Sequence, residues 1–588
     1  MYDTVIRGGR VVDGSGAVAR GADIAIKDGR IAEIGKIAAP ADQVIDADGA
    51  LVTPGFIDIH THYDGQFLWD DQMDPSFSHG VTTAIGGNCG VGFAPVAQEH
   101  RRELMEMMEG VEDIPGIVLD EGLDWGWRTF ADYLDRLGAR RYAMDVASHI
   151  THAPLRVFVM GERALKHEAA TGDDIAAMCG LVRDAMAAGA VGFSSGRLVE
   201  HLSSRGANVP GTFAHDDEIL AIARAMGESA RGVFQIIPKG AVGSAMMDEL
   251  GPAGRLEEHR RIEAIARAAG RPLTYSIAEF LSDPNDIRVI VAESDRAAAA
   301  GLEIRPQVAA RGVGMIHTLD SYHVFLMRPS YRQIAHLPRA ARAAAMRDPA
   351  LRQAILGDPD VEGEYAGDPN VMPMLRRMLG KLGKSYVLSS TVDYEPGPDR
   401  LVATLAQAAG KTAEEYVYDH YAAGDGSNFS VTLALNYASG DLNHVHDLLQ
   451  NPNVVSGLGD GGAHVKVICD AALPTFQLAF WTRERTRGAR LPVELIVRKL
   501  SADPAGLYGL KDRGELAVGK RADINVIDYA RLTPTAPHVA NDLPSGAGRL
   551  LQGSDGYLAT MVAGEVTRRH DKDTGARPGR LVRMGQTV

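Results

Sequence analysis

The sequence predicts an α/β protein, a (β/α)8 barrel of the TIM type joined to a small β domain that both chain ends form. Apolar strands alternate with amphipathic helices through the middle of the chain, a pattern typical of such barrels. Turn-rich β segments occur at the two ends. The length of 588 residues exceeds what one hydrophobic core usually supports, so we expect two domains.

The β domain is predicted from short apolar or alternating segments that Gly and Asp-Gly turns separate. These segments fill residues 2–53, and the same pattern of short segments occurs again at 514–519, 522–528 and 558–566. We expect residues 1–53 and 512–570 to fold together as this domain.

The barrel is predicted over residues 54–511. Helical patterns between its strands open with acidic residues, as at Asp173 and Asp216, and end near glycine, which helix termini favour. The eight predicted strands are 51–59, 81–87, 143–149, 190–195, 232–237, 272–277, 303–308 and 453–459.

A long segment, roughly residues 310–452, separates the seventh and eighth predicted strands. Ordinary βα loops are far shorter. We interpret the segment as an insertion over the barrel mouth, either a lid or a substrate-binding subdomain. An interface for a homo-oligomer is an equally weighted alternative.

Charge and composition restrict the partners. The chain has 61 basic and 76 acidic residues, a net charge of −15, without a basic run, so nucleic acid is not an expected partner. No stretch approaches the roughly 20 apolar residues of a membrane helix, and the start lacks the apolar core of a signal peptide. Three cysteines in a long chain imply no disulfide framework, so we expect a cytoplasmic protein without membrane contact.

The most informative segment runs from Pro54 to His62, where an apolar strand ends in His60-Thr61-His62. Alternate strand residues point the same way, so the two imidazoles face one side. At the C-terminal end of a barrel strand that side is the active-site mouth, and two neutral imidazoles there form half of a metal site. The His-x-His spacing alone is weak evidence for a metal site, because His444 and His446 have the same spacing without a preceding strand.

Two further strand ends offer metal ligands. The strand 453–459 precedes Asp460, which is either a base for an attacking water or a helix cap, with equal weight. Cys89 follows the strand 81–87 among glycines. It is either a thiolate ligand or, as lone cysteines more often are, an inert small residue.

Several segments in order along the chain together resemble the N-acyl-D-amino-acid deacylase (D-aminoacylase) branch of the amidohydrolase superfamily. They are PGFIDIHTHYDGQ, GGNCGVGFAP, SHITHAPLR, VGFSSGR, VPGTFAHDDEI, GLGDGGAH and GELAVGKRADINVID. The resemblance runs from about residue 2 to 565 and is weakest over 310–452. It implies a distorted (β/α)8 barrel with a composite β-sandwich, and a hydrolase that cleaves a C–N (amide) bond of a small molecule with metal-activated water.

The resemblance also implies roles for single residues. His60 and His62 would bind zinc, Cys89 would replace the bridging modified lysine of other superfamily members, and Asp460 would be both a metal neighbour and the general base. Either His149 or His152 would line the pocket.

This sequence departs from the family pattern at two strands. Members usually add a histidine from strand five and another from strand six, whereas here strand five carries Gln235 and strand six has no histidine. An amide oxygen is a poor zinc ligand. We therefore expect one Zn²⁺ held by His60, His62 and Asp460, with Cys89 as the candidate fourth ligand, and no second ion.

A deacylase of this type needs a cation for the substrate carboxylate. The residues expected to contact the substrate, four of them cations that follow barrel strands, are His149, His152, Arg197, Gln235, Lys239, Arg311, His464 and Lys466. The most specific function predicted is N-acyl amino acid deacylase. The alternatives are an amidohydrolase acting on another amide, a cyclic amide or a carbamate, and a non-catalytic scaffold that has lost metal ligands.

Overall fold

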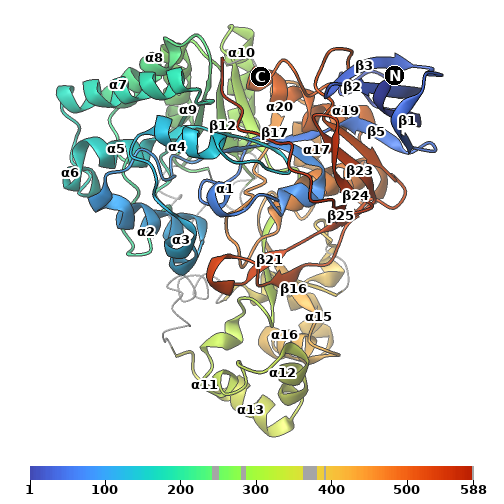
Figure 1. Cartoon of the computed structure of the whole chain (residues 1–588). Helices are drawn as coiled ribbons and strands as arrows, with labels where there is room; N and C mark the ends of the chain where they lie inside the picture. Colours follow the sequence, from blue (N-terminus) through green and yellow to red (C-terminus); the bar gives the residue numbers. More distant parts are fainter. Residues whose placement is uncertain (242–250, 280–285, 362–379, 390–392, 586–588) are drawn as a thin grey trace.

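Strands from both chain ends lie in one sheet of the computed structural model, which describes residues 1–241, 251–279, 286–361, 380–389 and 393–585 (Figure 1). Its strands are β1 (Tyr2–Val11), β2 (Arg20–Lys27), β3 (Arg30–Gly35), β4 (Ala41–Asp46), β5 (Leu51–Pro54), β18 (Ile524–Ile527), β23 (Tyr557–Val562), β24 (Glu565–Arg569) and β25 (Lys572–Asp573). Their order is β25-β24-β23-β18-β5-β1-β2-β3, with β4 beside β1. Ile6, Val52, Ile524 and Met561 are buried in one apolar cluster, so the two chain ends share a core.

Parallel strands form two further sheets, which position the site. They are β6 (Phe56–Asp58), β7 (Val81–Gly86), β8 (Asp145–Ser148), β9 (Ile150–Thr151), β10 (Gly192–Gly196), β11 (Val233–Ile237), β12 (Leu273–Ile277), β13 (Ile304–Val308) and β17 (Val455–Ser456). One sheet has the order β6-β7-β8 and the other β9-β10-β11-β12-β13-β17. Each predicted strand region contains a strand of this set, with β8 and β9 separated by one residue.

Helices connect the parallel strands, as the alternating pattern predicts. They include α2 (Arg101–Glu112), α4 (Phe130–Gly138), α5 (His152–Met160), α7 (Gly172–Ala188), α8 (Asp216–Gly227), α9 (Gly251–Ala269), α10 (Asp286–Ala299) and α17 (Asn443–Gln450). Helices α18 (Leu473–Ala479), α19 (Val493–Leu500) and α20 (Ala502–Leu507) follow β17. Helix α7 begins with a capping box, in which the Thr171 hydroxyl accepts from the Asp174 N–H and the Asp174 carboxylate accepts from the Thr171 N–H. Such boxes satisfy backbone donors that a helix N-terminus leaves unpaired.

The predicted strand 51–59 is two strands that belong to different sheets. β5 pairs with β1 and β18, whereas β6 pairs with β7. The change occurs at Gly55, where an added Cβ would lie 2.2 Å from Thr82 Oγ1. Only glycine permits this approach, so the chain passes there from the terminal sheet into the parallel sheet.

The ends of the first and last parallel strands meet directly. Thr61 and Gly461 form a parallel bridge. The His62 N–H donates to the Gly461 carbonyl at 2.8 Å, and the Asp460 N–H donates to the His60 carbonyl at 3.0 Å. These bonds place the segment after β6 beside the segment after β17.

The segment 310–452 contributes elements of its own, apart from residues 362–379 and 390–392, which lie outside the described ranges. They are β14 (Val313–Thr318), α11 (Pro329–Arg332), α12 (Arg339–Met346), α13 (Pro349–Gly357), β15 (Tyr386–Leu388), α15 (Val402–Ala408), α16 (Ala413–Ala422) and β16 (Phe429–Leu435). The strands form an antiparallel sheet in the order β14-β16-β15. The helices form the lobe at the bottom of Figure 1, around a separate apolar cluster that includes Phe325, Met346 and Tyr418.

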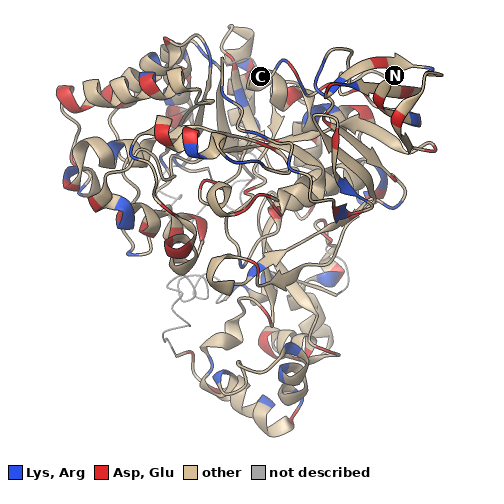
Figure 2. Cartoon of the chain, viewed as in Figure 1, with Lys and Arg blue, Asp and Glu red and all other residues tan. Residues whose placement is uncertain are grey.

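The chain beyond β25 returns to the parallel strands. Tyr142 bridges to Gly579 and Val146 to Leu581. Acidic and basic residues are interspersed along the elements in view in Figure 2. Within the described ranges, none of the helices combines the length and the apolar character that crossing a bilayer requires.

A buried network of ion pairs joins β8 to the terminal sheet. Asp145 accepts from Arg513 Nη1 at 2.6 Å and from Arg521 Nη2 at 3.0 Å, and Arg521 also binds Asp523, which directly precedes β18. We expect Asp145→Ala to lower the free energy of unfolding by about 3–5 kcal/mol in urea titration, because it removes the buried carboxylate that Arg513 and Arg521 share. The control Asp135→Ala removes an exposed partner of Arg583 and should change stability by less than about 1 kcal/mol. Equal stability of the two variants would contradict this role for Asp145.

Candidate active site

Two imidazoles and a thiol converge where the first two parallel strands end. His60 and His62 follow β6, and Cys89 follows β7. One ligand atom from each residue lies within 4.8 Å of the other two, and all three side chains are buried. The strand alternation that predicts a common direction for His60 and His62 thus agrees with the geometry.

A carboxylate from the last parallel strand completes the group. Asp460 Oδ1 lies 3.5 Å from His60 Nε2 and 3.8 Å from His62 Nε2. The backbone bond from Asp460 to His60 holds the two segments in this register. The alternative role predicted for Asp460 was that of a helix cap. Among the described residues no helix begins directly after Asp460, so it does not have that role.

The backbone of Cys89 is held by a side chain from β11. Cys89 has a φ of 56°, and its N–H donates to Gln235 Oε1 at 2.9 Å. Its Sγ lies 3.3 Å from His60 Nε2. Gln235 on β11 therefore fixes the backbone that carries the thiol.

The four residues line one cavity of about 590 Å³. Its walls are formed by His60, His62, Cys89, Glu112, His201, Ile237, Ala241, Ser276, Ile277, Ala278, Ala309, Val313, Leu435, Asn436, Leu458, Asp460 and His464. Of the sixteen described non-glycine residues with positive φ, five line this cavity: Cys89, Asn436, Leu458, Asp460 and His464. Backbone strain of this kind concentrates at functional sites.

The electrostatics of the cavity favour a bound cation. Burial raises the pKa of the Cys89 thiol well above its usual value, and Glu112, Asp460 and Asp64 add to the rise. Burial likewise raises the pKa of Asp460, with Asp470 and Asp58 adding to it. Burial lowers the pKa of His60 to about 4, so its imidazole is neutral. None of the described lining residues is a lysine or arginine that would offset these acids.

His149 and His152 have partners away from the cavity. His149 Nδ1 lies 3.0 Å from the Gly86 carbonyl and its Nε2 lies 3.1 Å from the Tyr508 hydroxyl. His152 Nδ1 lies 2.9 Å from Ser195 Oγ, and its Nε2 lies 2.8 Å from Glu218 Oε1. Neither histidine lines the cavity.

The four predicted cations also lie outside the cavity lining. Arg197 Nε binds Glu258 at 2.7 Å. Arg311 is buried, binds Asp470 at 2.5 Å and stacks over the Tyr394 ring at 3.8 Å. Lys466 Nζ lies 5.5 Å from the centre of the Tyr322 ring.

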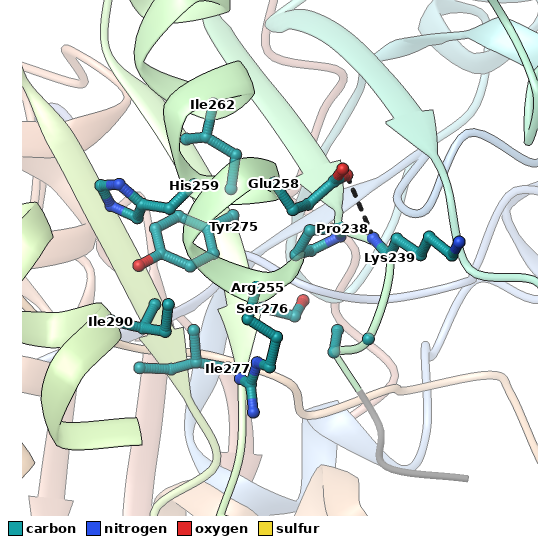
Figure 3. Close-up of a pocket in the computed structure, with 12 residues that line it drawn as sticks. Pro238, Lys239, Arg255, Glu258, His259, Ile262, Tyr275, Ser276, Ile277 and Ile290 are labelled. Atoms are coloured by element: carbon teal, nitrogen blue, oxygen red, sulfur yellow. Dashed lines mark hydrogen bonds between the residues drawn. The ribbon is translucent and has the colours of Figure 1, made fainter. Parts of the chain in front are cut away.

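Lys239 borders a second cavity, of about 290 Å³, that shares Ala241, Ser276 and Ile277 with the first (Figure 3). Its N–H donates to Glu258 Oε1 at 3.2 Å, while its side chain extends away from Tyr275 and Ile277. Of the eight residues expected to contact substrate, His464 lines the first cavity, and Gln235 supports it through Cys89.

Another group with metal-ligand chemistry, His259, Glu263 and Glu293, lies on α9 and α10. Arg296 forms ion pairs with both of these glutamates. An arginine thus already supplies the positive charge that a metal would bring.

The sequence reasoning missed Glu112, His201 and Gln307. Gln307 Oε1 lies 2.9 Å from His60 Nδ1. The position of Gln307 within the predicted strand 303–308 was the signal available, because a buried amide needs a polar partner. Glu112 ends an amphipathic helix within an acidic stretch, which resembles an ordinary solvated face, so the sequence contains no signal for it.

Comparisons with known proteins show what this chain is similar to. The family model described as amidohydrolase family matches residues 43–568. A D-aminoacylase of Alcaligenes xylosoxydans xylosoxydans is 35% identical over 286 residues, which are 48% of this chain and 52% of the relative. An N-acyl-D-glutamate deacylase of the same organism is 33% identical over 309 residues, 51% of this chain and 55% of the relative.

These matched stretches mean that the chain spans about half the length of the curated relatives it matches. Among solved structures, the N-acyl-D-glutamate deacylase from Bordetella bronchiseptica, complexed with zinc and a phosphonate inhibitor, superposes with a TM-score of 0.64 over 99% of both chains. At 23% identity this likeness shows a shared fold. Because the family model covers most of the sequence, including every segment that builds the cavity, the chain belongs to the amidohydrolase family.

Proposed function

We propose that this protein is a metal-dependent hydrolase that cleaves the amide bond of an N-acyl amino acid, with zinc held by His60, His62, Cys89 and Asp460. The observation that carries the proposal is the convergence of two imidazoles, a thiol and a carboxylate in one cavity. The relatives named as deacylases support the acyl amino acid as the substrate class.

The donor set fits zinc. Imidazole and thiolate are preferred zinc ligands, whereas calcium and magnesium prefer oxygen. The acidic lining without a described lysine or arginine agrees with a divalent cation, because buried acidic groups are costly when unpaired. When bound, zinc supplies a Lewis acid that polarises an amide carbonyl and lowers the pKa of water. We propose one ion, since β11 and β12 contribute no histidine.

Asp460 is the residue that we propose moves the proton. Its carboxylate faces the same point as the two imidazoles. It takes the proton of the attacking water and delivers it to the departing nitrogen, since an amine leaves poorly as an anion.

The walls of the cavity suit an apolar acyl group. Ile237 and Ile277 come from parallel strands, while Val313 and Leu435 come from β14 and β16. We propose that residues 310–452 form a substrate-binding subdomain, because two of its strands contribute to this wall. His464 is the polar residue of the lining that we propose to contact the substrate.

We also propose that the two parallel sheets form one distorted (β/α)8 barrel over residues 54–511, and that residues 1–53 and 512–570 form a β-sandwich domain. The Thr61–Gly461 bridge and the fold shared with the deacylase structure support the barrel. The three cysteines are free and buried, which fits a reducing cytoplasm.

Hydrolysis should depend on zinc. Purified protein should contain about one zinc per chain, and chelation should abolish turnover of N-acyl-D-amino acids, with zinc restoring it, because the described lining offers no other Lewis acid. Metal analysis and amine release from N-acyl-D- and N-acyl-L-amino acids, simple amides, cyclic amides and carbamates test this. Full turnover of the N-acyl-D-amino acids after the zinc is removed would refute the metal mechanism.

When loaded with zinc, Asp460→Asn should lose turnover by about 10²- to 10⁴-fold, the range that general acid–base catalysis typically contributes. Steady-state kinetics with measured metal content check this. Asp135→Asn, which changes an exposed carboxylate, is the control. Unchanged kcat in the metal-loaded Asp460 variant would remove Asp460 from proton transfer.

Cys89→Ala should weaken zinc binding by at least about tenfold, since even the outer partners of metal ligands typically contribute about 10- to 100-fold. The cobalt-substituted protein should show a thiolate-to-cobalt absorption band that this variant lacks. Cys179→Ala, which changes a cysteine buried in α7, should keep the band and the affinity. A band that survives in the Cys89 variant would exclude the thiolate as a ligand.

A further inference from the structure

The two imidazoles that face Asp460 have different partners on their far sides. His60 Nδ1 lies 2.9 Å from the amide oxygen of Gln307 on β13. His62 Nδ1 lies 3.2 Å from Oε1 of Glu112, the last residue of α2. The His60 imidazole therefore contacts a neutral amide, and the His62 imidazole contacts a carboxylate.

The contact between His62 and Glu112 is specific to these two atoms. His62 Nδ1 and Glu112 Oε1 form this close contact, and among the described residues neither atom has a hydrogen-bond partner. The other carboxylate oxygen, Oε2, lies 4.0 Å from His464 Nε2, so His62 is the nearer imidazole. The side chains of His62 and Glu112 are only 2% and 3% exposed, so water offers them little compensation.

The direction of the contact matches what a metal ligand needs. His62 Nε2 points toward Asp460, at 3.8 Å, while Nδ1 on the opposite side of the ring points toward Glu112. A carboxylate at Nδ1 favours the tautomer with its proton there, which leaves the Nε2 lone pair free for the cation. The negative charge also raises the basicity of the ring.

We infer that Glu112 is a positioning residue, whose carboxylate orients His62 and strengthens its bond to the metal. This inference rests on the proposed zinc site. Gln307 shows that an amide oxygen can make the same kind of contact with a histidine. What Glu112 adds to such a contact is its negative charge.

Zinc affinity, measured by competition with a chromophoric chelator, tests the inference. Glu112→Gln keeps the size and an acceptor oxygen but removes the charge, so zinc should bind about 10- to 100-fold more weakly. The melting temperature of the metal-free variant should match that of the metal-free wild type, which a merely structural role would not predict. Glu218→Gln is the control, since Glu218 is also a buried glutamate, 2.8 Å from His152 outside the cavity, although it additionally pairs with Arg156 at 2.7 Å. It should leave zinc affinity within twofold of the wild type.

A reciprocal variant keeps the test decisive if Glu112→Gln fails to fold. Gln307→Glu places a carboxylate behind His60, and it sacrifices no hydrogen bond of the amide nitrogen, which has no partner among the described residues. Zinc affinity should rise several-fold.

Three outcomes would overturn the inference while leaving the zinc site intact. They are wild-type zinc affinity in Glu112→Gln, an equal loss in Glu218→Gln, and no gain in Gln307→Glu. A wild-type protein that binds no zinc would instead refute the proposed function.

Discussion

Backbone pairing between the ends of the first and last parallel strands is the constraint on which the site depends. The bonds from His62 to Gly461 and from Asp460 to His60 join segments about 400 residues apart in the sequence. Side chains at alternate positions of such a pair point to the same side, so the two imidazoles and the carboxylate face one another. Gly55 permits this arrangement, because the chain passes there from the terminal sheet into the parallel sheet against Thr82.

The cavity at this junction combines features that oppose stability. Cys89, Asp460 and His464 lie in the left-handed backbone region, which costs roughly 1–2 kcal/mol for each residue without a glycine's freedom. The thiol and the carboxylates are buried near one another, and this raises the pKa values of Cys89, Glu112 and Asp460. Both features are explained if the fold is built to hold a cation that stabilises the anionic forms.

Two glutamines show how this chain differs from the family pattern. Gln235 on β11, where a histidine ligand is usual, binds the backbone N–H of Cys89. Gln307 on β13 contacts His60. These amide side chains contact two of the residues that we propose as ligands of one ion.

The sequence by itself determined the alternation of strands and helices and the pairing potential of both chain ends, and it predicts His60, His62, Cys89 and Asp460 as metal ligands. Hydrophobic period, turn residues and strand alternation act over short distances, so they are readable along the chain. The division of 51–59 into two strands was not readable, because it depends on contact with Thr82.

Only the tertiary structure decided which polar residues surround the histidines that we propose as metal ligands. Glu112 comes from a helix end and Gln307 from the seventh strand, and neither position is near the histidines in sequence. Conversely, Arg197 and Arg311 follow strands as a substrate cation would, but each binds a carboxylate elsewhere. The physical reason is that long polar side chains are placed by whichever partner packing brings within reach, and that partner is set by the fold rather than by local sequence.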